Sequence, residues 1–329
     1  MLSALIISLL AAIIPTAVYA ALFYWADRYE REPMWLVMLA FWWGAIPAVV
    51  VSVWGEMFLG TRFIQAPGSV AATLTEGALL VPAVEESVKA LALFAIYHWA
   101  YAEFDDSLDG LIYGAMVGLG FAMTENFLYF LSSYGNRSLS DFTWLFLLRT
   151  ILFGINHALY TGLTGLGLGL ARNSPRSYAN WLYPLLGLLA ATLVHGLHNF
   201  GIALTSARWT NLIFSGALAI IGLTLLPVVI WVIWQKQRAI LADELADEVG
   251  DTLSQDEYEL LLRHWHRPLL RRRDPTKRTQ VRRLHLYAEL ALHKRRLHTF
   301  GITREPQLPL QIGRIRAKLE ETTGLKIGG

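Results

Sequence analysis

Ionisable and amide side chains occur inside stretches that are otherwise apolar, where a charged group costs at least about 2.5 kcal/mol if the stretch crosses a membrane. They fall in four consecutive segments and are Glu85, Glu86, Lys89, Glu125, Asn126, Asn156, His157, His195, His198 and Asn199. If each segment is centred by its length, Glu85, His157 and His195 share one depth, and Glu125 lies about 7 Å from its own centre. We therefore expect these side chains to converge on one buried site.

The spacing within the first of these segments fits acid–base chemistry. Lys89 follows Glu85 by four residues and Glu86 by three, so on a helix it lies beside both carboxylates and can neutralise one of them. The second carboxylate is then available as a general base. Taken alone, Glu86 and Lys89 are equally well explained as an ion pair that holds a helix bundle together.

The imidazoles come from two later segments. His195 and Asn199 are four residues apart and share a helix face, and His157 supplies a second imidazole from another helix. This set can hold a metal ion or can donate hydrogen bonds to a developing oxyanion. Taken alone, each residue has a simpler structural explanation: Glu125 and Asn126 suit interhelical hydrogen bonding, and His198 suits a supporting position.

The elements that must position these groups are predicted to be membrane-spanning helices. The chain is 54% hydrophobic and 16% charged, whereas soluble domains carry about 25% charged residues. Each apolar segment can cross about 30 Å as a helix, and in hydrocarbon the backbone must satisfy its own hydrogen bonds. The segments are 3–25, 34–59, 70–100, 108–132, 143–170, 182–204 and 211–234. The predicted fold is an all-α polytopic bundle of about seven transmembrane helices.

Charge divides the chain into two parts. Residues 1–235 hold 9 Lys and Arg against 13 Asp and Glu, whereas residues 236–329 hold 19 against 13. We expect a transmembrane core at 1–235 and a basic, soluble, helical tail at 236–329. The chain contains no Cys, which excludes disulfides and thiolate-bound metal.

Basic residues in the short loops predict the orientation. Arg28, Arg31, Arg172, Arg176, Lys236 and Arg238 fall on one side, and Arg62, Arg137 and Arg208 on the other. The richer side is expected to be cytoplasmic, so the N-terminus lies outside and the tail inside the cytoplasmic (inner) membrane.

The tail has its own helix signals. Leu241–Gly250 is acidic and helix-like, Ser254 and Glu257 fit a capping box, and Val281–Phe300 is a further predicted helix. Such a tail is either a solvated helical domain or a basic surface for anionic lipid or a regulator. It has no nucleic-acid-binding motif, and we expect no nucleic-acid partner.

Four motifs taken in order resemble those of the PrsW family of intramembrane proteases. They are Glu85-Glu86-Ser87-Val88-Lys89, Gly120-Phe121-Ala122-Met123-Thr124-Glu125-Asn126, the segment of His157, and His195-Gly196-Leu197-His198-Asn199. Asp27–Pro33, after the first helix, is similar to a further segment of that family. The resemblance covers residues 1–235 and implies a helical membrane core that hydrolyses peptide bonds of single-span membrane proteins, in the best-known family role an anti-sigma factor.

Carried over by position, the resemblance makes Glu85 and Glu86 the catalytic carboxylates, with Glu125, His157 and His195 completing the site and Asn199 at an oxyanion or supporting position. We expect hydrolysis by activated water, with zinc held by His157, His195 and Glu125. A metal-independent mechanism, in which Glu and His activate the water, stays open because no His-Glu-x-x-His helix is present. Two other functions are compatible with buried Glu, Lys and His: an ion- or proton-coupled transporter, and a non-catalytic scaffold. The sequence predicts no oligomeric state.

Overall fold

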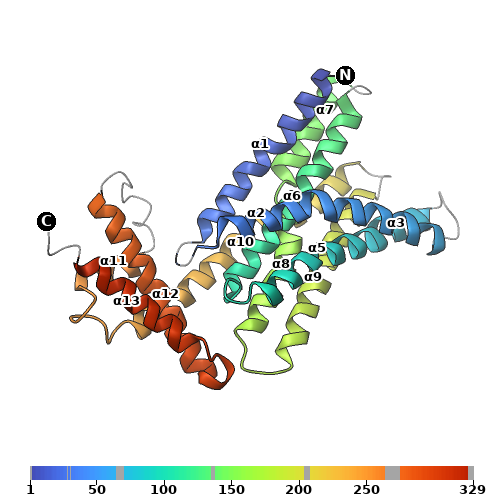
Figure 1. Ribbon diagram of the computed structural model, residues 1–329. Coiled ribbons are helices and arrows are strands. Elements are labelled where there is room, and N and C mark those ends of the chain that lie inside the picture. Colours follow the sequence, from blue (N-terminus) through green and yellow to red (C-terminus); the bar gives the residue numbers. More distant parts are fainter. Residues whose placement is uncertain are drawn as a thin grey trace. The chain divides into compact units, whose positions relative to one another are not determined.

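The computed structural model describes residues 2–27, 29, 31–63, 70–134, 138–203, 208–263 and 275–324. Within these residues the chain forms helices and no strand, apart from one isolated bridge between Val249 and Leu253 (Figure 1). The elements are α1 (Leu2–Ala26), α2 (Met34–Trp43), η1 (Gly44–Ala48), α3 (Val49–Phe63), α4 (Val70–Thr75), η2 (Glu76–Leu80), α5 (Val81–Trp99), α6 (Ser107–Tyr134), α7 (Leu139–Phe146), η3 (Leu147–Leu152), α8 (Asn156–Arg172), α9 (Ala179–Ala203), α10 (Arg208–Glu244), α11 (Gln255–Leu262), α12 (Pro275–Arg304) and α13 (Leu308–Gly324).

Six helices in the described part of the chain are long and apolar enough to cross a membrane. They are Leu2–Ala26, Met34–Gly60, Ser107–Tyr134, Leu139–Arg172, Ala179–Ala203 and Ile213–Glu244. The segment predicted at 70–100 is also helical, but Glu85, Glu86 and Lys89 make its middle less apolar than these six. The predicted all-α, multi-pass bundle is confirmed.

The orientation of the chain in the membrane stays a prediction. Two of the basic residues on which it rests, Arg28 and Arg137, lie outside the described residues, and nothing is described of the side chains of Arg62 and Arg208.

Contacts divide the chain into two compact units. The first comprises Met1–Asp27 and Glu32–Ile230, and the second comprises Arg28–Arg31 and Trp231–Gly329. Helix α10 is continuous through the point of division, and it also contains the boundary at residue 235 that the charge distribution predicts.

The centre of the first unit is α6, in which every residue from Ser107 to Ala122 is buried. It packs against α1, α2 and α8, and α8 in turn packs against α9. Glycines allow the α6–α8 approach, because a Cβ placed on Gly118 would lie 2.1 Å from the carbonyl oxygen of His157, and one on Gly114 would lie 2.5 Å from that of Thr161. The backbone of α8 at His157 therefore rests directly on α6.

Two π-helical segments precede the elements that carry the charged side chains. η2 leads into α5, and η3 ends before a non-helical stretch at 153–155 after which α8 begins. Such segments widen a helix locally and are frequent at functional sites. The two helices that follow them, α5 and α8, pack against each other.

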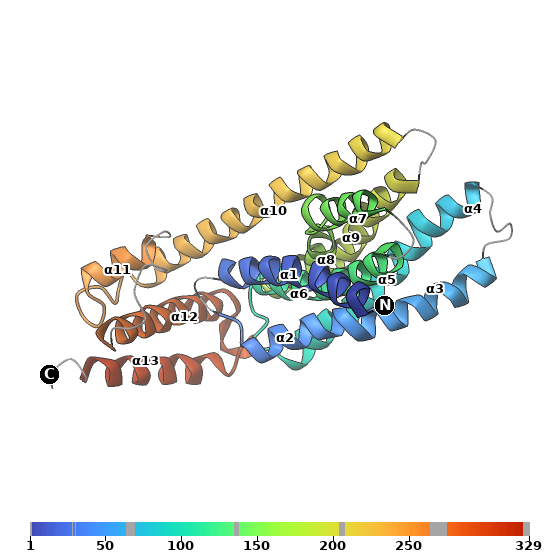
Figure 2. The ribbon, with the colours of Figure 1, turned by 90° about the horizontal axis from the view of Figure 1, so that it is seen from above.

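The second unit has its own apolar core, and its α12 and α13 lie side by side (Figure 2). The predicted capping box is present, since the Ser254 side chain accepts from the Glu257 backbone and the Glu257 side chain accepts from the Ser254 backbone. The predicted helix at 281–300 lies within α12, which has a break at Gly301. The helix predicted to run to Gly250 is wrong beyond Glu244, because the chain turns there and Gly250 adopts a φ of 90°.

Candidate active site

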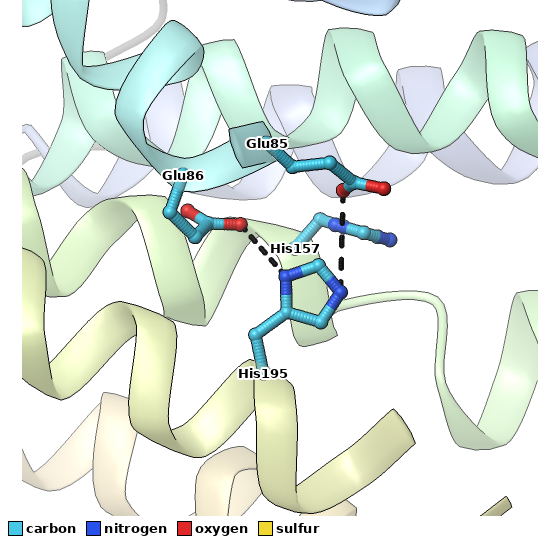
Figure 3. A group of neighbouring side chains, drawn as sticks. All are labelled: Glu85, Glu86, His157 and His195. Carbon is cyan, nitrogen blue, oxygen red and sulfur yellow. Dashed lines mark hydrogen bonds and ion pairs between the residues drawn. The ribbon is translucent and has the colours of Figure 1, made fainter. Parts of the chain in front are cut away.

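Two carboxylates and two imidazoles from three helices converge in the first unit. Glu85 and Glu86 come from α5, His157 from the start of α8 and His195 from α9 (Figure 3). One potential ligand atom from each lies within 4.8 Å of the others. We call these four residues the Glu/His cluster. It brings together four of the six residues that the family resemblance assigns to the site.

Lys89 lies inside the cluster rather than beside it. Its Nζ donates to Glu85 Oε2 and to Glu86 Oε1, both at 2.9 Å, and lies 3.2 Å from His157 Nδ1. The expected position of Lys89 beside both carboxylates is therefore confirmed, and its single positive charge is shared between them. Its side chain is fully buried, so these contacts replace its hydration.

Glu86 is the more fully engaged carboxylate. Its Oε1 lies 2.9 Å from Lys89 Nζ and 3.0 Å from His195 Nδ1, and its Oε2 accepts from the Thr161 hydroxyl at 3.0 Å. Glu85 differs, since among the described residues only its Oε2 is hydrogen-bonded, to Lys89, and its side chain is 9% exposed. Glu85 therefore keeps one oxygen available for water.

The two imidazoles are held by different carboxylates, which fixes their tautomers. Because an ionised carboxylate only accepts, Nδ1 of His195 carries the proton that points to Glu86, and its Nε2, 4.0 Å from Glu85 Oε2, keeps a lone pair. In the same way Nε2 of His157 donates to Glu125 Oε2 at 2.9 Å, which leaves its Nδ1 to accept from Lys89. The two rings lie 5.1 Å apart, centre to centre.

Glu125 occupies a supporting position behind His157, outside the Glu/His cluster. The oxygen that meets His157 also lies 2.9 Å from Arg149 Nη2, and Arg149 Nε donates to Asn126 Oδ1 at 2.7 Å. Arg149 belongs to η3, so this ion pair connects α6 to the segment just before α8. The assignment of Glu125 as a metal ligand stays a prediction.

Asn199 contacts the segment that leads into α5. Its Nδ2 donates to the carbonyl of Gly77, in η2, at 3.0 Å, and among the described residues it makes no hydrogen bond to the Glu/His cluster. One turn earlier on α9, Gly196 approaches the same π-helix so closely that a Cβ would lie 2.3 Å from the Ala78 oxygen. Asn199 thus anchors α9 to the start of α5, and its oxyanion role stays a prediction.

Three supporting residues were missed in the sequence because nothing local indicates them. Arg149 lies in an apolar segment without a motif, and Thr161 is one of many small residues. Tyr160, buried, stacks on His195 at 4.7 Å between ring centres and lies edge-on to His157. His198 lies beyond this tyrosine, against Phe153, in the supporting position that was expected for it. The contacts of these residues depend on helix packing, which the sequence alone does not show.

The arrangement suits hydrolysis in an enclosed environment. It offers a carboxylate with an available oxygen, an imidazole lone pair and a buried cation within one hydrogen-bonded group. Its donor types, two imidazoles and two carboxylates, are also those that bind zinc, and Thr161 and Glu125 stand behind Glu86 and His157 as outer partners do in metal sites. The residue types therefore fit a metal ion.

Comparison with known proteins points to the same chemistry. Residues 32–233 match the family described as PrsW family intramembrane metalloprotease. "Protease PrsW" of Geobacillus kaustophilus is 30% identical over 201 residues, which are 60% of this chain and 80% of that protein. The protein of the same name from Bacillus subtilis is 30% identical over 58% of this chain and 80% of its own length.

A more distant relative, "Protease PrsW" of Clostridioides difficile, is 25% identical over 68% of this chain and 86% of its own length. No solved structure gives a significant match. The family match contains all six predicted site residues and ends before the tail. A match over more than half of the chain, on the segments that build the Glu/His cluster, shows that this protein belongs to the PrsW family of intramembrane proteases.

Proposed function

We propose that this protein hydrolyses peptide bonds of single-span membrane proteins with a water molecule activated by Glu85. The observation that carries the proposal is the convergence of Glu85, Glu86, His157 and His195 within 4.8 Å, on helices of a multi-pass membrane bundle. Peptide hydrolysis needs a base, a stabiliser of the oxyanion and a proton donor for the leaving amine, and the cluster can supply all three.

Glu85 is proposed as the base because it keeps an oxygen that is not engaged by the described residues. It takes a proton from water, the hydroxide adds to the scissile carbonyl, and the same proton passes to the leaving amine as the C–N bond breaks. Glu86 holds the Nδ1 proton of His195, so that Nε2 faces the reacting groups. Its role is to position His195 rather than to accept a proton.

Zinc is the proposed metal, and His157, His195 and Glu86 are the residues that would hold it, which leaves Glu85 to act as the base. Bound there, it would polarise the scissile carbonyl and favour ionisation of water. The metal-independent alternative uses the same residues, with Lys89 and the imidazoles stabilising negative charge.

The substrate and the location are proposed on the same basis. Exposed Leu and Ile side chains on α1 and α10 suit contact with lipid, and a single-span substrate reaches such a site laterally through the bilayer. We place the N-terminus outside and the tail inside the cytoplasmic membrane, as the loop charges predict. An anti-sigma factor is one member of this substrate class.

The test uses purified protein reconstituted in proteoliposomes with a labelled single-span substrate. We expect fragments with the wild type and none with Glu85→Gln or His195→Ala. The control is Glu244→Gln, which removes a carboxylate from the end of α10 and should leave cleavage unchanged. Fragments with both cluster variants would refute the proposal, provided that all variants insert equally.

A further inference from the structure

Lys89 forms hydrogen bonds with the same side-chain atoms that a metal ion would need as ligands. An ammonium has three N–H groups, and those of Lys89 are all used, by Glu85 Oε2, Glu86 Oε1 and His157 Nδ1. Three of the four members of the Glu/His cluster therefore already coordinate a cation. For His157 the conflict is complete, because Nε2 faces Glu125 and Nδ1 faces Lys89, which leaves the ring no lone pair for a metal.

The contacts between Lys89 and the cluster have the lengths of hydrogen bonds. Its Nζ lies 2.9 Å from Glu85 Oε2, 2.9 Å from Glu86 Oε1 and 3.2 Å from His157 Nδ1. Zinc holds N and O ligands at about 2.0–2.2 Å. A zinc ion at the place of the ammonium would therefore need these three ligand atoms to move inward, and it would need the ammonium to leave.

Charge and packing prevent the Lys89 ammonium and a metal ion from occupying the site at the same time. The face of Phe121 lies 3.7 Å from Lys89 Nζ, which adds a cation–π contact to the three hydrogen bonds. The lysine side chain is fully buried, so no water lies between it and the cluster to screen a second positive charge. Two like charges at such separations repel strongly in a medium of low polarity.

We infer that Lys89 is the resident cation of this site and competes with divalent metal for it. Metal binding then requires withdrawal of the Lys89 ammonium from Glu85, Glu86 and His157. The inference builds on the proposed function, in which the same residues hold the metal. It adds that the chain itself supplies one positive charge to the metal-free cluster, and that metal affinity is set by how readily Lys89 leaves.

The experiment measures zinc affinity rather than activity. Wild type and Lys89→Met, both purified in detergent and stripped with a chelator, are titrated with zinc in competition with a chromophoric chelator. We expect Lys89→Met to bind zinc about tenfold more tightly or better, because no ammonium must first be displaced. Equal or weaker binding by Lys89→Met, or no zinc binding by either protein, would overturn the inference.

A matched control separates competition from general charge. Arg149→Met removes one positive charge from the neighbouring ion pair with Glu125, but no contact to Glu85 or Glu86. Competition predicts a clearly smaller gain in zinc affinity for Arg149→Met than for Lys89→Met. Equal gains would show that only the local charge matters, and the inference would fail.

A second measurement covers the case in which Lys89→Met does not fold. A cryo-electron microscopy structure of the wild type with saturating zinc should show Lys89 Nζ moved away from both carboxylates. Zinc bound while Nζ keeps these contacts would overturn the inference. Neither readout involves cleavage. If the wild type showed no peptidase activity, the proposed function would fail, but the inference about Lys89 would not be affected.

Discussion

Two of the buried ion clusters in the described part of the chain have almost the same distances but different composition. In the membrane unit, Lys89 lies 2.9 Å from each of two carboxylates. In the tail unit, Arg283 Nε lies 3.0 Å from Glu257 Oε1, with both side chains less than a tenth exposed. Judged by burial and distance alone, the two clusters are equivalent.

The difference lies in what remains after the charges are paired. Arg283 meets both oxygens of Glu257, and it also donates to neutral oxygens that include the Thr252 carbonyl and the Tyr287 hydroxyl. Lys89 faces two carboxylates, and two imidazoles stand beside it. The tail cluster is balanced and suits a structural role, whereas the membrane cluster has a surplus of proton acceptors that can do chemistry.

The largest expected effect is on the cleavage rate, and it comes from removing the carboxylate of Glu85. Glu85→Gln should lower the cleavage rate of a single-span substrate about a thousandfold, since the base is lost while the shape is kept. Glu257→Gln should leave the rate unchanged. Rates are measured in proteoliposomes at equal amounts of inserted protein. A similar loss in both variants would contradict the distinction between the two clusters.

Breaking the balanced cluster should affect stability instead. Arg283→Met leaves the Glu257 carboxylate buried without its cation, and we expect the tail to lose about 3 kcal/mol of stability. Hydrogen exchange of tail peptides in the intact protein measures this loss. Lys236→Met, an exposed change on α10, is the control and should have little effect.

A smaller effect on cleavage is expected from the ion pair behind the site. Arg149→Met removes the partner that holds Glu125 against His157, and the rate should fall about tenfold, because the ring is less well oriented. Arg176→Met, in an exposed loop, serves as the control. An unchanged rate in Arg149→Met would show that Glu125 needs no such partner.

The smallest expected effect is a change in the stability of the tail with pH. Burial alone would raise the pKa of Glu257, but the Arg283 guanidinium outweighs it and holds the pKa below its ordinary value. The stability gained from this ionisation is therefore complete above the ordinary pKa of Glu and is lost as pH falls through the lowered value. Exchange of tail peptides, corrected for intrinsic rates, should rise on acidification more in the wild type than in Glu257→Gln.

The apolar lengths and the order of the motifs were enough to predict the helical bundle and the residues of its centre. Apolar periodicity and loop signals are local, so the helix at 281–300 and the capping box at Ser254 could be predicted from neighbouring residues alone. The exit from α10 at Glu244 could not, because the chain turns there around Gly250, which has a positive φ.

The side-chain contacts within the site could be predicted only in part. That Lys89 meets Glu85 and Glu86 follows from helical spacing, but its third contact, to His157, depends on how α8 packs across α6. The roles of Arg149 and Tyr160 have the same origin. Such contacts link positions far apart in the chain, and one sequence contains no measure of their distance.

The contact between Gly118 and the backbone of His157 means that the position of His157 is fixed by how closely the backbones of α6 and α8 approach, and not by side-chain packing between them. Because no Cβ separates them, the two backbones are in direct contact there, and the backbone of His157 cannot move closer to α6. Adjustment of the site to a substrate must therefore come from side chains rather than from movement of α8 against α6.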